Sequence, residues 1–213
     1  MGEMKKKTLK MTLCSVMSAV MLTSVIGPVQ AAEESSWKTG MKDHWNFDSL
    51  QSDQGEKTTA TLHGINIVDS EDPVFGKVLR FGSGTDKYLR LGNYINTGKN
   101  STSFSMWYRY DTKITGDGAD KSAVLLQHEG DGRSLLTLKG DGKYNTYINK
   151  TDVNSEKSVP KGDWQHVTVV FDQKQNKVSY YVNGELDSTK DMGTEKIDKV
   201  LSLRLGAHKN NGN

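Results

Sequence analysis

Alternation between apolar and polar residues limits the fold of this chain more than any other feature. Between Gly162 and Asp187 two such runs follow each other, joined by a polar turn. Successive side chains of a strand point to opposite faces of a sheet, so a period of two residues predicts a β ribbon. No stretch of ten residues keeps the apolar period of 3.6 residues that a helix needs. The predicted class is therefore all-β.

Twelve runs are predicted to be strands, at a spacing typical of a sandwich or barrel. They cover His44–Asp48, Thr59–Leu62, Lys77–Phe81, Tyr88–Leu91, Ser103–Asp111, Ser122–Glu129, Ser134–Lys139, Lys143–Asn149, Gln165–Asp172, Lys177–Asn183, Glu185–Thr189 and Leu201–Gly206. Gly-Asp-Gly turns occur at 116–118, 130–132 and 140–142, and Asn183-Gly184 is a strong signal for a two-residue hairpin. The runs between Gln165 and Thr189 are therefore predicted to form a three-strand meander.

The first 31 residues have the pattern of a secretory signal peptide. Four lysines precede an apolar stretch from Met11 to Ile26, and small residues up to Ala31 offer a cleavage site before two acids. The apolar stretch is too short for a lasting membrane span. We expect cleavage near Ala31, a linker over 32–42 and a secreted or cell-surface domain over 43–213.

The signal segment also holds the single cysteine, Cys14, so the secreted chain is expected to depend on its core, or on a metal, without a disulfide. Four of the 28 basic and one of the 26 acidic residues lie in this segment, which leaves the remainder close to neutral. No nucleic-acid partner is predicted from that charge. After the strand pattern of 201–206 only a loop-like end follows. In this sequence no later segment follows that could pair with this strand or cover it. We therefore expect the sequence to be a fragment of a longer protein.

Five motifs follow one another along the chain: His44-Trp45-Asn46-Phe47-Asp48, Phe75-Gly76-Lys77-Val78-Leu79-Arg80-Phe81, Ser103-Phe104-Ser105-Met106-Trp107-Tyr108-Arg109, Gly162-Asp163-Trp164-Gln165-His166-Val167 and Tyr181-Val182-Asn183-Gly184-Glu185. Their order and spacing resemble a laminin-G-like domain of the concanavalin A-like lectin and glucanase superfamily. The resemblance implies a jelly-roll β-sandwich of two antiparallel sheets, often with a structural Ca²⁺, for which Asp48 is the candidate ligand. The family's usual last strand, with an acidic pair after a glycine, has no counterpart here, which implies an incomplete C-terminus.

The superfamily contains both glucanases and lectins, so a catalytic motif has to decide between them. One glucanase branch of the superfamily, with which this chain could be confused, uses Glu-x-Asp-x-x-Glu on one strand to supply a nucleophile and an acid/base. Residues Glu185 to Lys190 come nearest, but Lys190 stands where the second glutamate belongs. The histidines have no metal-ligand spacing. We predict that this segment is not catalytic.

A sugar-binding face is predicted on the run from Ser103 to Asp111. Phe104, Met106 and Tyr108 occupy one side of that strand, which leaves Trp107 and Arg109 on the other. An indole beside a guanidinium provides a flat apolar surface and planar donors for a sugar ring. The alternative is that Trp107 belongs to the core and Arg109 is a surface charge.

The further carbohydrate-binding candidates are Gln127, Glu129, Tyr147 and Arg204, whereas Trp164 and His166 are interpreted as sheet packing. These features predict a secreted, non-catalytic carbohydrate-binding module, lectin-like, that binds a glycan or polysaccharide. They also predict a downstream catalytic domain, a glycoside hydrolase, in the same chain. One alternative is a structural or protein-adhesion module, and another is a glycosidase in its own right.

Overall fold

The computed structural model describes residues 41–56, 58–82, 84, 86–95, 101–111, 122–128, 134–148, 151–193 and 200–206. The expected signal peptide, most of the linker, the Gly-Asp-Gly turns at 116–118 and 130–132 and the final loop lie outside these residues. Every regular element within them is a strand, as an all-β class requires. They include no helix with the length and apolarity needed to cross a membrane.

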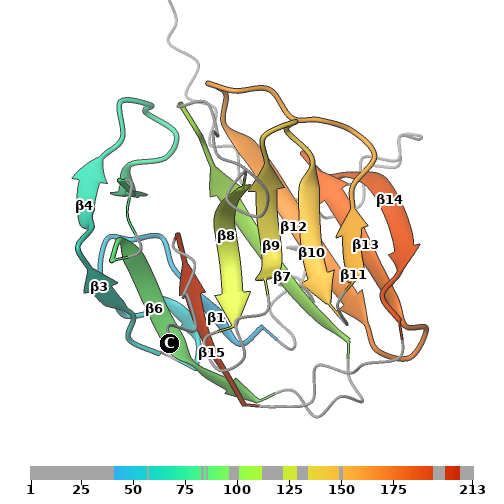
Figure 1. Cartoon of the computed structure of the whole chain (residues 1–213). Coiled ribbons are helices and arrows are strands. Elements are labelled where there is room, and N and C mark those ends of the chain that lie inside the picture. The colour runs from blue at the N-terminus through green and yellow to red at the C-terminus, as the bar shows by residue number, and fades with distance from the viewer. Residues whose placement is uncertain are drawn as a thin grey trace, which may run out of the picture. The chain divides into compact units, whose positions relative to one another are not determined.

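Two antiparallel sheets form the layers of a sandwich (Figure 1). The larger sheet has the order β11 (Thr151–Asn154), β10 (Tyr144–Ile148), β9 (Ser134–Lys139), β8 (Ser122–His128), β15 (Val200–Leu205), β6 (Tyr88–Ile95) and β3 (Thr61–His63). The smaller sheet has the order β14 (Glu185–Asp191), β13 (Lys177–Val182), β12 (Gln165–Asp172) and β7 (Thr102–Tyr108). Two separate ribbons pair β1 (Asp43–His44) with β2 (Gln54–Gly55), and β4 (Asn66–Asp69) with β5 (Lys77–Arg80).

Alternating residues of the two sheets fill the space between them. On β12, Val167, Val169 and Phe171 are fully buried, while the residues between them are partly exposed. They pack in one core cluster with Leu136 of β9 and Leu203 of β15. Burial of the apolar half of each strand is the main driving force for this arrangement. The jelly-roll sandwich predicted from the sequence is confirmed.

The meander of β12, β13 and β14 is also confirmed, together with its Asn183-Gly184 turn. Val182 pairs with Glu185 across this turn. Both central residues have left-handed backbone angles, with φ of 51° at Asn183 and 86° at Gly184. This is the two-residue turn whose twist matches that of the flanking strands, and asparagine followed by glycine tolerates it best.

Two sequence predictions about strands are wrong. The first predicted strand, His44–Asp48, shrinks to β1, because Phe47 adopts a φ of 63° and the indole N–H of Trp45 turns back to the carbonyl of Leu50 at 3.1 Å. The last strand was expected to lack a partner. Instead β15 lies inside the larger sheet, hydrogen-bonded to β8 on one side and β6 on the other.

Candidate functional site

The outer face of the smaller sheet carries the predicted pair Trp107 and Arg109. Phe104, Met106 and Tyr108 of β7 pack against the core, so alternation turns Trp107 to the opposite side. Its side chain is 47% exposed. Trp107 is therefore not a core residue, and the alternative interpretation of it is wrong.

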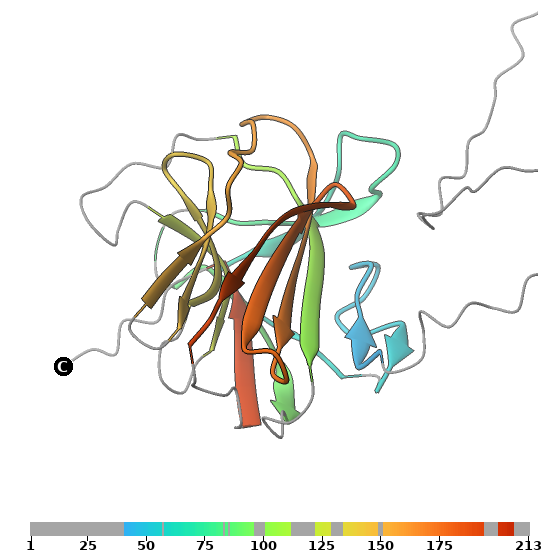
Figure 2. The same ribbon diagram turned by 90° about the vertical axis from the view of Figure 1, so that its right-hand side faces the viewer.

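An aromatic cluster surrounds Trp107, formed by Phe75, Trp107, Trp164 and His166. Register pairs His166 of β12 directly with Trp107 of β7, and their rings lie 5.0 Å apart at 40°. Phe75, from the loop between β4 and β5, stacks on Trp164 at 4.1 Å and lies 5.2 Å from Trp107. In Figure 2 the teal β4–β5 hairpin reaches the end of the smaller sheet beside the green β7. Rings from three distant segments thus form one apolar surface.

Polar groups border the aromatic cluster on two sides. The guanidinium of Arg109 lies 5.6 Å from the Trp164 ring centre and pairs with Asp111 at 3.1 Å. On the other side, His166 Nε2 is 2.7 Å from Ser105 Oγ, which in turn is 3.0 Å from Thr168 Oγ1. An apolar surface flanked by a cation and hydroxyl groups suits a ligand with both ring faces and hydroxyls.

The imidazole of His166 is predominantly neutral at neutral pH, because burial lowers its pKa from the ordinary value of 6.5. An unfolded chain would take up a proton near pH 6.5 while the folded chain resists it. Stability therefore contains a His166 contribution that is constant above pH 6.5 and is lost as the pH falls below it. We expect His166→Gln to reduce the loss of unfolding free energy between pH 7.5 and 5, measured by urea titration. Equal losses in the two proteins would contradict this assignment.

The remaining predicted sugar ligands lie on the other sheet. Arg204 of β15 pairs in register with Gln127 of β8, and both side chains are buried. Leu203 packs in the core, so Arg204 faces outward, where its guanidinium lies 3.9 Å from the Tyr88 ring centre. Tyr88 also stacks on His63 at 4.2 Å. Tyr147 of β10 is on this same outer face and is 43% exposed.

The predicted residues therefore do not form one site. Trp107 and Arg109 occupy the outer face of the smaller sheet, and Gln127, Tyr147 and Arg204 that of the larger sheet. Glu129 lies outside the described residues. Trp164 and His166, interpreted from the sequence as packing, join Trp107. The two-residue spacing of Trp164 and His166 indicated that they share a face. No pattern in the sequence around Phe75 indicated that its ring would join them.

The predicted calcium ligand, Asp48, lies just after β1 and hydrogen-bonds with Asn46. Its carboxylate accepts a hydrogen bond from the side chain of Asn46 at 3.0 Å. The Asp43 carboxylate accepts hydrogen bonds from the hydroxyls of Ser52 and Thr58. The described residues hold no group of three or more His, Cys, Asp or Glu side chains placed for a metal. Ca²⁺ takes six to eight oxygens, so these residues alone do not fit it, and calcium stays a prediction.

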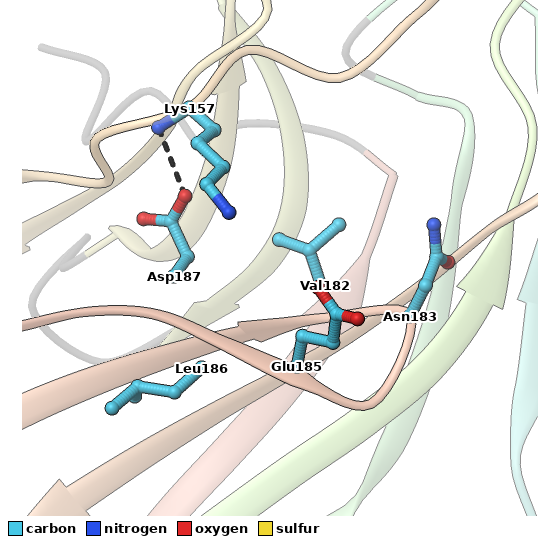
Figure 3. Close-up of a pocket in the computed structure, with 6 residues that line it drawn as sticks. All are labelled: Lys157, Val182, Asn183, Glu185, Leu186 and Asp187. Carbon is cyan, nitrogen blue, oxygen red and sulfur yellow. Dashed lines mark hydrogen bonds between the residues drawn. The ribbon is translucent and has the colours of Figure 1, made fainter.

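A shallow hollow of about 340 Å³ opens beside the β13–β14 turn (Figure 3). It is lined by Lys157, Val182, Asn183, Glu185, Leu186 and Asp187. Burial alone would raise the pKa of Asp187, but hydrogen bonds from Glu156 N, Ser188 Oγ and Lys157 N hold this pKa below its usual range. A general acid needs the opposite shift. Asp187 thus anchors the loop before β12 to β14 as a fixed carboxylate.

Comparison with known proteins agrees with this architecture. A family model described as the concanavalin A-like lectin/glucanases superfamily, of laminin G type, matches residues 83–213. No curated protein matches the chain. The binding domain of Paraclostridial Mosquitocidal Protein 1 superposes with a TM-score of 0.60 at 18% identity, over 79% of this chain and 44% of that one. The chain thus spans less than half the length of that relative.

Two further solved structures share the fold. Domain 4 of AbnA, a GH43 extracellular arabinanase from Geobacillus stearothermophilus, solved with arabinotriose, has a TM-score of 0.57 at 15% identity, over 80% of this chain and 84% of that domain. Botulinum neurotoxin type C, whose cell entry depends on two ganglioside molecules, has a TM-score of 0.57 at 14% identity, over 81% and 44%. Identities this low establish the fold alone. Since the family model covers more than half of the sequence, the chain belongs to the concanavalin A-like lectin/glucanase superfamily.

Proposed function

We propose that this domain binds a glycan without cleaving it, and that the aromatic cluster is its binding surface. The observation that carries the proposal is the half-exposed indole of Trp107, on the outer face of the smaller sheet, in a cluster whose Trp164 ring also lies beside the Arg109 guanidinium. A sugar ring presents C–H groups that stack on an indole and hydroxyls that accept from a guanidinium. A fixed apolar surface of this kind loses little side-chain entropy on binding.

The proposal also covers where the domain is located and which kind of domain it is attached to. The N-terminal pattern supports export to the cell surface or medium, with cleavage near Ala31. Attached to a glycoside hydrolase, the module would raise the effective concentration of the enzyme on its polymer without changing the chemical barrier. The arabinanase domain solved with arabinotriose makes linear arabinan the first probe to use, beside xylan, cellulose and ganglioside oligosaccharides.

Replacing Arg109 by alanine tests the polar half of this surface. Loss of charge-assisted donors to sugar hydroxyls is expected to weaken binding by about 1.5 to 3 kcal/mol, about ten- to a hundredfold. Folding should change little, because the Arg109–Asp111 pair is largely exposed. Affinity electrophoresis in gels that contain each polymer gives the dissociation constant. Leu186→Ala, which removes another exposed side chain of the same sheet, is the matched control.

A protein-adhesion role is the second candidate, and the apolar tip of the β4–β5 loop favours it. Val74 in that loop is 72% exposed, next to Phe75 of the aromatic cluster. An exposed apolar tip beside aromatic rings is suited to a protein partner. Failure of the wild-type chain to bind any glycan of the panel, with capture of a protein partner that Val74→Ser abolishes, would replace the first proposal by this one.

A further inference from the structure

A second surface with sugar-binding chemistry lies on the larger sheet, at its β9–β11 edge. Tyr144 and Ile148 of β10 pack in the core, so alternation places Asn145 and Tyr147 on the outer face. Across the ladder, Tyr147 is opposite Asp152 and Asn145 is opposite Asn154. We call the group formed by Lys139, Asn145, Tyr147, Asp152 and Asn154 the edge network.

Asn145 is the hub of the edge network. Its side chain is 6% exposed, and its amide nitrogen Nδ2 lies 2.9 Å from Asp152 Oδ1 and 3.0 Å from Asn154 Oδ1. Its carbonyl oxygen is 3.4 Å from Thr137 Oγ1, and Lys139 Nζ lies 3.4 Å from Asn154 Oδ1. A buried carboxamide with its hydrogen-bonding groups engaged holds its partners rigidly. The side chains of Asp152 and Asn154 are thus fixed in place beside Tyr147.

The outer atoms of the edge network remain available to a ligand. Among the described residues no hydrogen bond reaches Asp152 Oδ2 or Asn154 Nδ2, and Lys139 Nζ uses one of its three hydrogens on Asn154. One acceptor and two donors therefore border an aromatic ring that is 43% exposed. Adjacent sugar hydroxyls need such a mixed set, and the ring provides a stacking surface. One carboxylate and one ammonium balance in charge, which favours a neutral ligand.

If the edge network served only to stabilise the fold, it would hold the edge strand β11 against β10. An exposed Tyr147 ring would contribute nothing to that role. This ring makes no hydrogen bond or ring contact within the described residues, and it stays exposed on the face to which the polar atoms point. The aromatic cluster lies on the outer face of the opposite sheet, with the core between the two surfaces. In a sandwich these outer faces look in opposite directions, so one rigid ligand cannot reach both.

We propose that the edge network is a second binding surface for a neutral glycan, and that the domain is bivalent and bridges two polymer chains. This inference rests on the proposed function for its ligand class but on different residues for its geometry. Bivalence raises the apparent affinity for a dense polymer by about a hundredfold or more without any new contact. A module with a surface on each side of its sandwich can bind adjacent chains of a cell-wall or storage polysaccharide.

Stoichiometry and cross-linking test the proposal on the full chain. The probes are linear arabino-, xylo- and cello-oligosaccharides in calorimetry, followed by the matching soluble polymer in light scattering. The wild-type chain should bind two oligosaccharides, and Tyr147→Ala and Trp107→Ala one each. The double variant should bind none. The wild type should cross-link the polymer, whereas the alanine variants should not. Tyr147→Phe, which keeps the ring, should behave like the wild type. Asp152→Asn should weaken the edge site about tenfold.

The outcomes separate the two proposals. One site in the wild type, lost in Trp107→Ala and unchanged in Tyr147→Ala, overturns the second surface and leaves the proposed function intact. One site lost in Tyr147→Ala and unchanged in Trp107→Ala overturns bivalence and moves the proposed function to the larger sheet. Absence of binding by the wild type to every probe overturns both. Far-ultraviolet circular dichroism of each variant confirms that the exposed replacements leave the sandwich folded.

Discussion

Trp107→Ala is expected to weaken glycan binding by about 2 to 4 kcal/mol, roughly 30- to 1,000-fold, with little loss of stability. Aromatic anchors in the centre of a binding surface contribute effects of this size because they exclude water from a large apolar contact. Trp107 is half-exposed, and the rings of Phe75 and His166 are tilted against it at centroid distances of 5.2 and 5.0 Å, so its side chain is not enclosed as a core residue is. Truncation therefore removes a ligand contact and leaves no buried cavity.

Calorimetric titration of the best oligosaccharide gives the affinity, and a thermal melt of the same sample gives the stability. Trp107→Phe, which retains a smaller ring, should recover part of the affinity. If Trp107→Ala instead lowered the unfolding free energy by more than about 3 kcal/mol, the indole would be acting as a core residue. Normal affinity in a folded Trp107→Ala protein would move the site away from the aromatic cluster.

The local part of this site could be predicted from the sequence. Alternation along β7 turns Trp107 to the face of the sheet away from Phe104. In the same way, alternation along β12 turns His166 to the face away from Val167. Both follow from the two-residue period and the need to bury one face. The turn at Asn183-Gly184 is equally local, because the residue types and the required φ angles coincide. These features concern neighbours in sequence.

The non-local part could not be predicted. Phe75 reaches Trp164 only because the β4–β5 ribbon docks on the smaller sheet, and β4 has just four residues with polar ends. The strand β11, with Asp152 and Asn154 in four residues, has a low β-propensity and was missed for that reason. The assignment of strands to sheets depends on long-range packing. Residues that were each predicted to bind carbohydrate, such as Arg109 and Arg204, accordingly lie on opposite sides of the sandwich.

The second large expected effect is on stability, and it concerns the core residue Phe171 of β12. Phe171→Ala should lower the free energy of unfolding by about 3 to 5 kcal/mol, through lost transfer energy and a cavity. Phe171 is fully buried, lies edge-on to Phe104 at 6.3 Å, and belongs to the cluster that joins both sheets. A domain of this size is stabilised by about 5 to 15 kcal/mol, so this loss is a large fraction of the total.

The adjacent residue provides the matched control, because Val170 lies on the same strand but faces outward and is only half-buried. Val170→Ala should therefore lower the unfolding free energy by about 1 kcal/mol or less, since the site can relax toward solvent. Urea unfolding monitored by tryptophan fluorescence gives both values. Similar losses in the two variants would mean that β12 is buried on both sides. In that case the outer face of the smaller sheet would be covered, and a glycan could not reach Trp107.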